Sequence, residues 1–391
     1  MNGLLNTYAR QPIAFTHGQG ARLWDEAGKE YLDALSGIAV NGLGHAHPAL
    51  VRAIADQAAQ LIHTSNIYRV PLQERLAERL CQLSSMDGAF FCNSGAEANE
   101  AAIKLARLYG HQRGVAVPTI IVMERAWHGR TIATLSATGS RKAQAGFEPL
   151  VAGFVRVPYN DLEAVRAVAE RNPDVVAVLL EPIQGEGGIR VAEAAYQQNL
   201  ARLCREQNWL YMVDEVQTGI GRTGRWFATE DAGVIPDVLI LAKGLGSGVP
   251  IGACLARGEA AQVFKPGNHG TTFGGGPLVC AAALATLDAM ERESLLDNAR
   301  ERGHQLLAGL RSELNDVVGV VDIRGHGLMV GVELDRPCGI LVTQALEQGL
   351  LINVTSDKVV RLLPPLIIDT VQIERLLEIL VPLIRGFLGA S

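Results

Sequence analysis

The stretch Asp237-Val-Leu-Ile-Leu-Ala-Lys243, followed by Gly244-Leu-Gly-Ser-Gly248, decides the fold class of this chain. A short apolar run bounded by turn residues is typical of a buried parallel strand. A second such run, Leu210-Tyr-Met-Val213, ends in Asp214. Because ligands of open α/β sheets bind at the carboxyl ends of the strands, we expect Lys243 and Asp214 to face one site.

A lysine and an aspartate at one sheet edge suit the chemistry of pyridoxal phosphate. A desolvated lysine loses its proton easily and attacks aldehydes, while a carboxylate can hold a protonated pyridine nitrogen. Two other interpretations compete. Lys243 could be a solvated surface charge, as most lysines are, and Asp214 with Glu215 could bind magnesium in a phosphoryl-transfer enzyme. The second would need a Gly-x-x-x-x-Gly-Lys-Ser/Thr loop, which the sequence lacks.

Composition sets the class of protein. The 391 residues are 48% hydrophobic and 19% charged, which is typical of a globular protein with a large core. The net charge of −6, without a basic tract, argues against nucleic acid as a partner. The six cysteines show no metal-ligand spacing, so we predict a reducing compartment and no metal site. Without a leader-like N-terminus or a membrane-length apolar run, we expect a soluble cytoplasmic protein.

The order of strands and helices predicts an α/β fold with a second, smaller domain. Strand-like and helical segments alternate from residue 89 to residue 243, which favours a mostly parallel sheet covered by helices on both faces. After Gly276-Pro277 the pattern changes to a long helix over 278–315, short strands and a terminal helix over 371–388. We therefore expect an N-terminal segment (1–48) that packs with the small domain, a large cofactor-binding domain (49–277) and a C-terminal small domain (278–391).

The segment Phe90-Phe-Cys-Asn-Ser-Gly-Ala-Glu-Ala-Asn-Glu100 reads as a strand, a tight turn and the start of a helix. Free N–H groups and the helix dipole at such a start bind phosphate, and Gly95 and Ser94 would allow a close approach and add a hydroxyl. The alternative is an ordinary helix start in which Ser94 caps the helix and Glu97 completes a capping box. Both interpretations can hold together.

Two further stretches could complete a cofactor site. Trp127 could cover the ring of a cofactor, and Arg130 could grip a substrate carboxylate with two parallel hydrogen bonds. The hydroxyls of Thr271 and Thr272, beside glycines, suit a second phosphate contact. The alternatives are a core tryptophan with a surface arginine, and a flexible turn.

Glu186 and Arg361 form a possible pair for handling dicarboxylates. Glu186 follows a buried strand, and Arg361 lies at the end of another strand. A buried arginine needs a carboxylate partner when no substrate is present, so Glu186 could fill that place and swing away when a substrate arrives. A purely structural ion pair is the alternative.

Taken together, the sequence resembles the subgroup III (class III) pyridoxal phosphate aminotransferases over nearly its whole length. The motifs that carry the resemblance occur in order along the chain: Thr7-Tyr-Ala-Arg-Gln-Pro12, Gly37-Ile-Ala-Val-Asn41, Gly44-His-Ala-His-Pro48, Asn93-Ser-Gly-Ala-Glu-Ala-Asn-Glu100, His128-Gly-Arg-Thr131, Glu181-Pro-Ile-Gln-Gly-Glu186, Asp214-Glu-Val-Gln217, Lys243-Gly244 and Arg361-Leu-Leu-Pro-Pro365. Together they are highly specific for the group but only moderately specific for the substrate.

The resemblance implies a fold-type I transferase, with a mostly parallel seven-stranded sheet in its large domain, and a homodimer whose active sites are shared between subunits. The catalytic residues it implies are Lys243, which forms the Schiff base and moves the proton, and Asp214, which keeps the pyridine nitrogen protonated. The cofactor-binding residues it implies are Ser94, Gly95, Ala96, Trp127, Asp214, Gln217, Lys243 and Thr272.

The resemblance also assigns the substrate contacts. Arg130 would hold the α-carboxylate of the amino donor, and Arg361, gated by Glu186, that of glutamate. Thr271 would lie beside the substrate. Gln217 would hydrogen-bond the ring hydroxyl of the cofactor, while Thr272 would reach the phosphate from the neighbouring subunit.

Within this family the sequence is most similar to members that act on N-acetylornithine. The implied reaction moves the δ-amino group of N-acetylornithine to 2-oxoglutarate. Run in the reverse direction, this reaction would serve arginine synthesis. Two positions depart from the family: Trp127 stands where Phe or Tyr is usual, and Gly37-Ile38 replaces a tyrosine of ornithine aminotransferases. Succinylornithine, ornithine, 4-aminobutyrate or N-succinyl-diaminopimelate as donor, an aminomutase, and a non-catalytic cofactor carrier remain alternatives.

Overall fold

A computed structural model of the protein describes residues 3–389, and a seven-stranded sheet lies at the centre of one half of that part. Its strands are β4 (Gly88–Cys92), β5 (Thr119–Met123), β6 (Phe154–Val157), β7 (Val175–Leu180), β10 (Leu210–Asp214), β11 (Val238–Leu241) and β12 (Gly252–Ala256). They lie in the order β4-β12-β11-β10-β7-β5-β6. All neighbours are parallel except β12, which is antiparallel to both β11 and β4. The expected mostly parallel seven-stranded sheet is confirmed.

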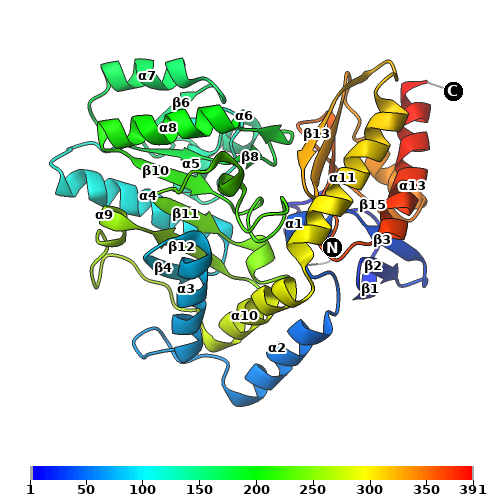
Figure 1. The fold of residues 1–391 in the computed structure, drawn as a ribbon, viewed down its shortest axis with the longest axis horizontal. Coiled ribbons are helices and arrows are strands. Elements are labelled where there is room, and N and C mark those ends of the chain that lie inside the picture. Colours follow the sequence, from blue (N-terminus) through cyan, green and yellow to red (C-terminus); the bar gives the residue numbers. More distant parts are fainter. Residues whose placement is uncertain (1–2, 390–391) are drawn as a thin grey trace.

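Both faces of this sheet are covered by helices, which explains why its strands are apolar throughout (Figure 1). The helices that contact the strands include α4 (Gly95–Gln112), α8 (Ala194–Gln207) and α9 (Gly258–Ala261). Further out, α7 (Leu162–Arg171) packs against α8, and α5 (Ile132–Ala137) lies between α4 and α6 (Arg141–Gln144). Along β5, Ile120 and Val122 pack with residues of α4, whereas Ile121 and Met123 pack with residues of α7 and α8. This alternation follows from the two-residue period of a strand.

The segment after the sheet departs from the sequence prediction. We expected one helix over 278–315, but the structure has two, α10 (Pro277–Arg292) and α11 (Leu295–Leu314). Ser294 between them adopts a left-handed conformation with φ of 52°, which ends one helix and redirects the next. Figure 1 shows α10 beneath the large sheet and α11 rising beside the second half of the molecule.

Two smaller sheets form the second half. One has the order β13-β14-β17-β16 and is antiparallel throughout, and the other has the order β1-β2-β3-β15. Their strands are β1 (Phe15–Gln19), β2 (Arg22–Asp25), β3 (Glu30–Asp33), β13 (Val320–His326), β14 (Met329–Leu334), β15 (Leu350–Leu351), β16 (Asn353–Thr355) and β17 (Val359–Leu362). The parallel pairing of β3 with β15 joins the N-terminal hairpin to the C-terminal part of the chain. The division into three domain segments stays a prediction.

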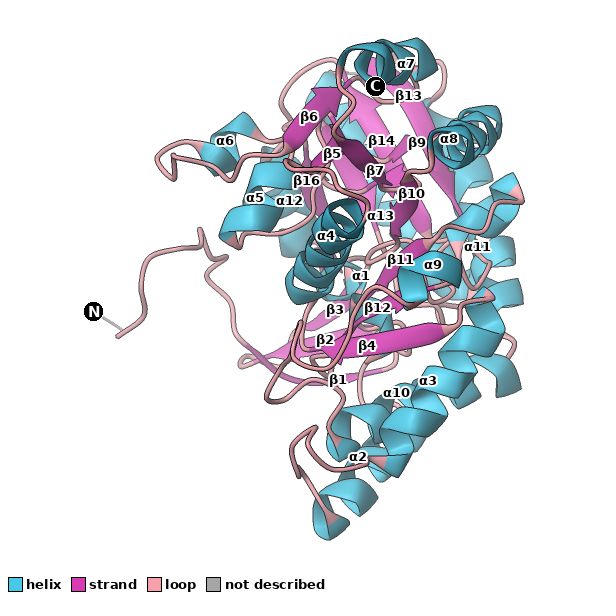
Figure 2. Cartoon of the chain, turned by 90° about the vertical axis from the view of Figure 1, so that its left-hand side faces the viewer, coloured by secondary structure: helices cyan, strands magenta, loops and turns pink. Residues whose placement is uncertain are grey.

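The remaining elements pack around these sheets or link their strands (Figure 2). They are α1 (Ser36–Ala39), α2 (Pro48–Gln60), α3 (Pro71–Ser84), β8 (Ile183–Gln184), β9 (Arg190–Val191), α12 (Ile340–Glu347), α13 (Thr370–Leu388), and short 3-10 turns over Ala228–Ala232 and Lys243–Leu245. The hairpin of β8 and β9 follows the carboxyl end of β7. None of the helices within residues 3–389 combines the length and the apolar character that crossing a membrane requires.

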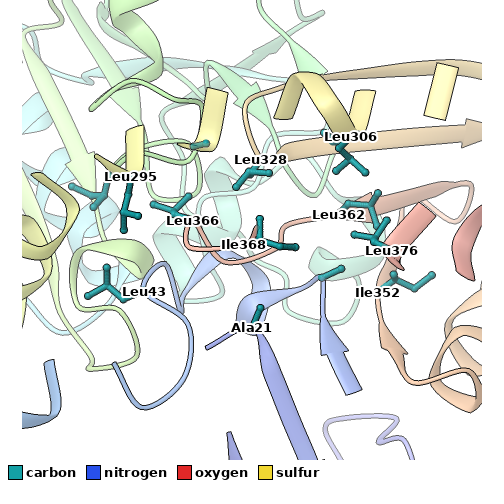
Figure 3. Packing of buried hydrophobic residues seen from close by; sticks show 14 of the residues in the cluster. Ala21, Leu43, Leu295, Leu306, Leu328, Ile352, Leu362, Leu366, Ile368 and Leu376 are labelled. Carbon is teal, nitrogen blue, oxygen red and sulfur yellow. The ribbon is translucent and has the colours of Figure 1, made fainter. Parts of the chain in front are cut away.

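One apolar cluster runs between the two halves of the molecule (Figure 3). Leu43, Leu295, Leu328 and Leu366 come from four distant parts of the sequence and are almost completely buried in it. Truncating a leucine in such a core to alanine destabilises a protein by about 2–5 kcal/mol. The cluster therefore fixes the small sheets against the edge of the large sheet where the candidate site lies.

Candidate active site

A cavity of about 510 Å³ lies at the carboxyl ends of the central strands. Three of its ionisable lining residues come from that edge: Glu181 follows β7, Asp214 ends β10, and Lys243 comes two residues after β11. Eight of the predicted site residues line the cavity, namely Ser94, Gly95, Ala96, Trp127, Arg130, Asp214, Gln217 and Lys243. The other four, Glu186, Thr271, Thr272 and Arg361, are not part of its lining.

Lys243 lies where the chain leaves β11 for a short 3-10 turn. Its φ of 42° is unusual for a residue with a side chain, and such strained positions are common at functional sites. Burial, followed by the positive charge of Arg361, lowers the pKa of the Lys243 ammonium to about 8. The neutral amine, which a nucleophile needs, is therefore far more populated near physiological pH than it is in an ordinary lysine, although the protonated form still predominates there.

Asp214 is held by three N–H donors. Its Oδ2 accepts hydrogen bonds from Nδ1 of His128 at 2.8 Å and from Nδ2 of Asn99 at 2.9 Å, and its Oδ1 accepts one from the Val216 N–H at 2.9 Å. With 4% of its surface exposed, the carboxyl group is oriented by these three donors. Sequence reasoning did not assign roles to His128 or Asn99, because the contact joins segments that are far apart in the chain.

The start of α4 combines a helix cap with free donors. Ser94 Oγ accepts from the Glu97 N–H at 3.2 Å, while the Glu97 carboxylate accepts from the Asn93 N–H at 2.6 Å, so the capping box is displaced by one residue. Within residues 3–389, no acceptor faces the N–H groups of Gly95 and Ala96. A Cβ on Gly95 would come 2.7 Å from Val216 Cγ1. The start of α4 therefore offers the free N–H groups of Gly95 and Ala96 to an anion.

Trp127 and Arg130 form one wall of the cavity. The guanidinium of Arg130 lies over the Trp127 ring, with its carbon 4.8 Å from the centroid, so the ring holds the charge in place. The backbone N–H of Trp127 donates a hydrogen bond to Glu181 Oε2 at 2.9 Å. Burial first, and then the charge of Asp214, raise the pKa of the Glu181 carboxyl well above its usual range. Glu181 is a lining residue to which sequence reasoning gave no role.

Arg361 and Glu186 meet beside the cavity. Nη1 of Arg361 lies 2.6 Å from Glu186 Oε1 and 3.3 Å from Oε1 of Gln217, which lines the cavity. The Arg361 side chain is fully buried, whereas 32% of the Glu186 side chain is exposed. Nη2 of Arg361 is buried without an acceptor among the described residues. A carboxylate that replaced Glu186 would therefore find a second donor on the same guanidinium.

Thr271 and Thr272 differ in their surroundings. Thr271 Oγ1 accepts from Nδ2 of Asn93, a lining residue, at 3.4 Å. Thr272 is exposed, and the structure does not bring it to the cavity of its own chain. Beside it, Phe273 exposes 67% of its surface.

Comparison with known proteins identifies the architecture. The model of the class-III aminotransferase family matches residues 6–384. Acetylornithine aminotransferase 1 of Bordetella pertussis is 61% identical over 388 residues, which cover 99% of each chain. Acetylornithine aminotransferase of Nitrosomonas europaea is 59% identical over 388 residues, again 99% of each chain.

Solved structures of aminotransferases have the same fold as this chain. The ornithine aminotransferase of Toxoplasma gondii ME49 superposes with a TM-score of 0.95 at 35% identity, covering 98% of this chain and 93% of that one. N-acetylornithine aminotransferase of Stenotrophomonas maltophilia K279a gives a TM-score of 0.85 at 35% identity, covering 98% of each chain. A further structure of the Toxoplasma enzyme holds pyridoxal phosphate at partial occupancy in its active site.

Proposed function

Because the chain belongs to the class-III aminotransferases, which use pyridoxal phosphate, we propose that it moves the δ-amino group of N2-acetylornithine to 2-oxoglutarate. The products are N-acetylglutamate 5-semialdehyde and glutamate, and run in reverse the reaction serves arginine synthesis. The observation that carries the aminotransferase chemistry is the shared cavity of Lys243 and Asp214, at the ends of the neighbouring strands β11 and β10. The choice of N-acetylornithine is supported by the relatives of about 60% identity, which carry that name.

The lining residues fit pyridoxal phosphate at each of its functional groups. The free N–H groups of Gly95 and Ala96, with Ser94, suit the phosphate. Asp214 suits the ring nitrogen, and Trp127 the ring face. When bound, the cofactor supplies an aldehyde for the lysine and a ring that accepts electrons from the substrate carbon.

Each catalytic residue then has one task. The amine of Lys243 would hold the aldehyde carbon of the cofactor, and in the presence of substrate its Nζ would move the proton to and from the substrate carbon. Asp214, oriented by its three donors, would hold the ring nitrogen of the cofactor. The Gln217 amide would donate to the ring oxygen.

Two arginines divide the substrate carboxylates between them. Arg130, stacked on Trp127, holds the α-carboxylate of acetylornithine, and Thr271 lies beside that substrate. Arg361 holds the α-carboxylate of glutamate after Glu186 has moved toward solvent, where its side chain is already partly exposed. The buried, unpartnered Nη2 of Arg361 supports this exchange, because a bidentate carboxylate would satisfy it.

The site is completed in a homodimer, in which Thr272 contacts the phosphate of the partner's cofactor. Exposed apolar side chains around Thr272 support this assignment: Ile67 exposes 81% of its surface, Tyr68 66% and Phe273 67%. Asn66 ties these two segments together by donating to the Thr271 carbonyl at 3.2 Å. The patch has the apolar character of a subunit interface.

The reaction is tested by following the amino group. The enzyme is mixed with 2-oxoglutarate and with N-acetylornithine that carries ¹⁵N at its δ-amino group, and mass spectrometry should find the label in glutamate. Double-reciprocal plots of the initial rate, at several fixed concentrations of the second substrate, should give the parallel lines of ping-pong kinetics. Formation of labelled glutamate from ornithine but not from acetylornithine would reassign the substrate. Turnover without any 2-oxoglutarate would indicate an aminomutase instead.

A further inference from the structure

One nitrogen of Arg361 holds two side chains that have different tasks in the proposed reaction. Nη1 donates one hydrogen to Glu186 Oε1 at 2.6 Å and lies 3.3 Å from Oε1 of Gln217, which accepts the other. Nε of the same guanidinium donates to Asn353 Oδ1 at 3.1 Å, and the side chain is fully buried. The guanidinium is therefore held by three side chains, and it connects the carboxylate gate to a residue that lines the cavity.

The chemistry of arginine decides which end of the Gln217 amide faces the cavity. Arginine carries donors only, so the amide oxygen must be the atom turned toward Arg361. The amide nitrogen lies on the other branch of the same planar group. Gly185 makes room for this arrangement, because a Cβ there would come within 2.2 Å of Gln217 Oε1. Gln217 is thus left with an N–H donor for the cavity.

We propose that Arg361 is a positioning residue for the cofactor as well as a carboxylate binder: by holding Gln217 Oε1 it aims Gln217 Nε2 at the ring oxygen of pyridoxal phosphate. The proposal rests on the proposed function. Its consequence is a link between the two halves of the reaction. A substrate carboxylate that takes both Nη1 and Nη2 draws the guanidinium away from Gln217, and the ring oxygen loses part of its donor.

The absorption of the bound cofactor can measure the effect of Arg361 on Gln217. An N–H donor to the ring oxygen withdraws electron density from it, so the proton shared with the lysine-bound nitrogen leaves at lower pH. Loss of the donor should raise the pH midpoint of the cofactor's absorption change. A hydrogen bond of ordinary strength corresponds to a shift of about half to one pH unit.

The test is a double-mutant cycle on that midpoint in the cofactor-loaded enzyme. Arg361→Lys keeps the positive charge but breaks the bidentate geometry, and Gln217→Met removes the amide. We expect Arg361→Lys to raise the midpoint by about half to one pH unit when Gln217 is present and to leave it unchanged in the Gln217→Met background. An equal shift in both backgrounds would mean that Arg361 acts through its charge alone and would overturn the proposal, as would no shift in either.

A second arm needs no substitution of Arg361. Glutarate, an unreactive dicarboxylate, should raise the midpoint of the wild-type enzyme and leave that of Gln217→Met unchanged. Gln198→Met is the matched control, because the Gln198 amide donates to the Ala232 carbonyl outside the cavity lining, and it should respond as the wild type does. Equal responses in Gln217→Met and wild type would contradict the link. A purified protein without any cofactor absorption would instead defeat the proposed function, so the two failures are distinguishable.

Discussion

Nδ1 of His128 lies 2.8 Å from Oδ2 of Asp214, and both side chains are almost fully buried. Because an ionised carboxylate only accepts hydrogen bonds, Nδ1 must carry the proton. The contact attaches the segment after β5, which also carries Trp127 and Arg130, to the carboxylate at the end of β10. His128 therefore keeps Asp214 oriented in the place proposed for the ring nitrogen of the cofactor.

Replacing His128 by phenylalanine should weaken catalysis without emptying the site. Asp214 would lose one of three donors, and a hydrogen bond to a charged group contributes about 1.5–3 kcal/mol, so we expect kcat to fall roughly 10- to 100-fold. His128→Asn, which keeps a donor, should restore part of the loss. His304→Phe on the exposed side of α11 is the control. Unchanged kcat in His128→Phe would show that Asn99 and Val216 suffice to hold Asp214.

The lowered pKa of Lys243 predicts how apoenzyme captures the cofactor. Below pH 8 the amine is mostly protonated and cannot attack the aldehyde, and above it the amine is mostly neutral, because burial lowers its pKa to about 8. The rate of covalent capture should therefore rise through a midpoint near pH 8. Stopped-flow absorbance of apoenzyme mixed with pyridoxal phosphate measures this, and a midpoint near that of an ordinary lysine would contradict it. Lys243→Ala should retain the cofactor noncovalently and lose turnover.

Gly95 has no room for a side chain at the start of α4, where we propose that the phosphate binds. A Cβ there would lie 2.7 Å from Val216 Cγ1, and overpacking of this kind costs about 1–3 kcal/mol. We expect Gly95→Ala to raise the Kd for pyridoxal phosphate roughly 5- to 100-fold, and Val216→Ala in the same chain to restore part of the affinity. Gly88→Ala is the matched control, since nothing lies within 4 Å of its added methyl. Equal Kd values for Gly95→Ala and Gly88→Ala would show that Gly95 does not contribute to the phosphate site.

Because Arg130 and Arg361 are proposed to bind different substrates, losing Arg361 should slow the two half-reactions unequally. Arg361→Ala should lose about 2–5 kcal/mol of transition-state stabilisation in the glutamate half-reaction and much less in the acetylornithine half-reaction. Single-turnover rates with each substrate separate the two, and Arg375→Ala on the exposed face of α13 serves as the control. Equal losses in both half-reactions would mean that one arginine serves both carboxylates.

Mixed dimers test whether Thr272 acts across the subunit interface. Lys243→Ala and Thr272→Glu should each be impaired alone, the second because it places a negative charge beside the phosphate. If Thr272 serves the partner's site, a hybrid dimer has one site with both defects and one intact site, so mixing should restore part of the activity. If it serves its own site, each site of the hybrid keeps one defect and mixing restores nothing.

The sequence predicts the strands and the charged residues at their ends well, because a strand buried on both faces is apolar throughout and its polar ending stands out. It missed β12, whose Gly252-Ala-Cys-Leu-Ala256 lacks the β-branched residues typical of strands and is stabilised by pairing with β11 and β4. It also missed the end of α10, because the left-handed Ser294 has no glycine or proline to mark it.

The candidate site shows the same limit. Lys243, Asp214 and the Ser94-Gly95 turn each follow from local sequence. The roles of His128, Asn99 and Glu181 depend on contacts between segments that only the fold brings together, such as the bond from Asn99 on α4 to Asp214 on β10. A motif indicates that such residues are close to the site, but not which atom each one holds.

Single-turnover bleaching of the enzyme-bound cofactor tests which amine the enzyme accepts. The donors compared at equal concentrations are N-acetylornithine, N-succinylornithine, ornithine and 4-aminobutyrate. We predict a yellow protein that N-acetylornithine bleaches much faster than ornithine or 4-aminobutyrate does, and that 2-oxoglutarate then restores to yellow. Faster bleaching by ornithine or 4-aminobutyrate would contradict the substrate assignment, and no bleaching by any of the four would contradict the account as a whole.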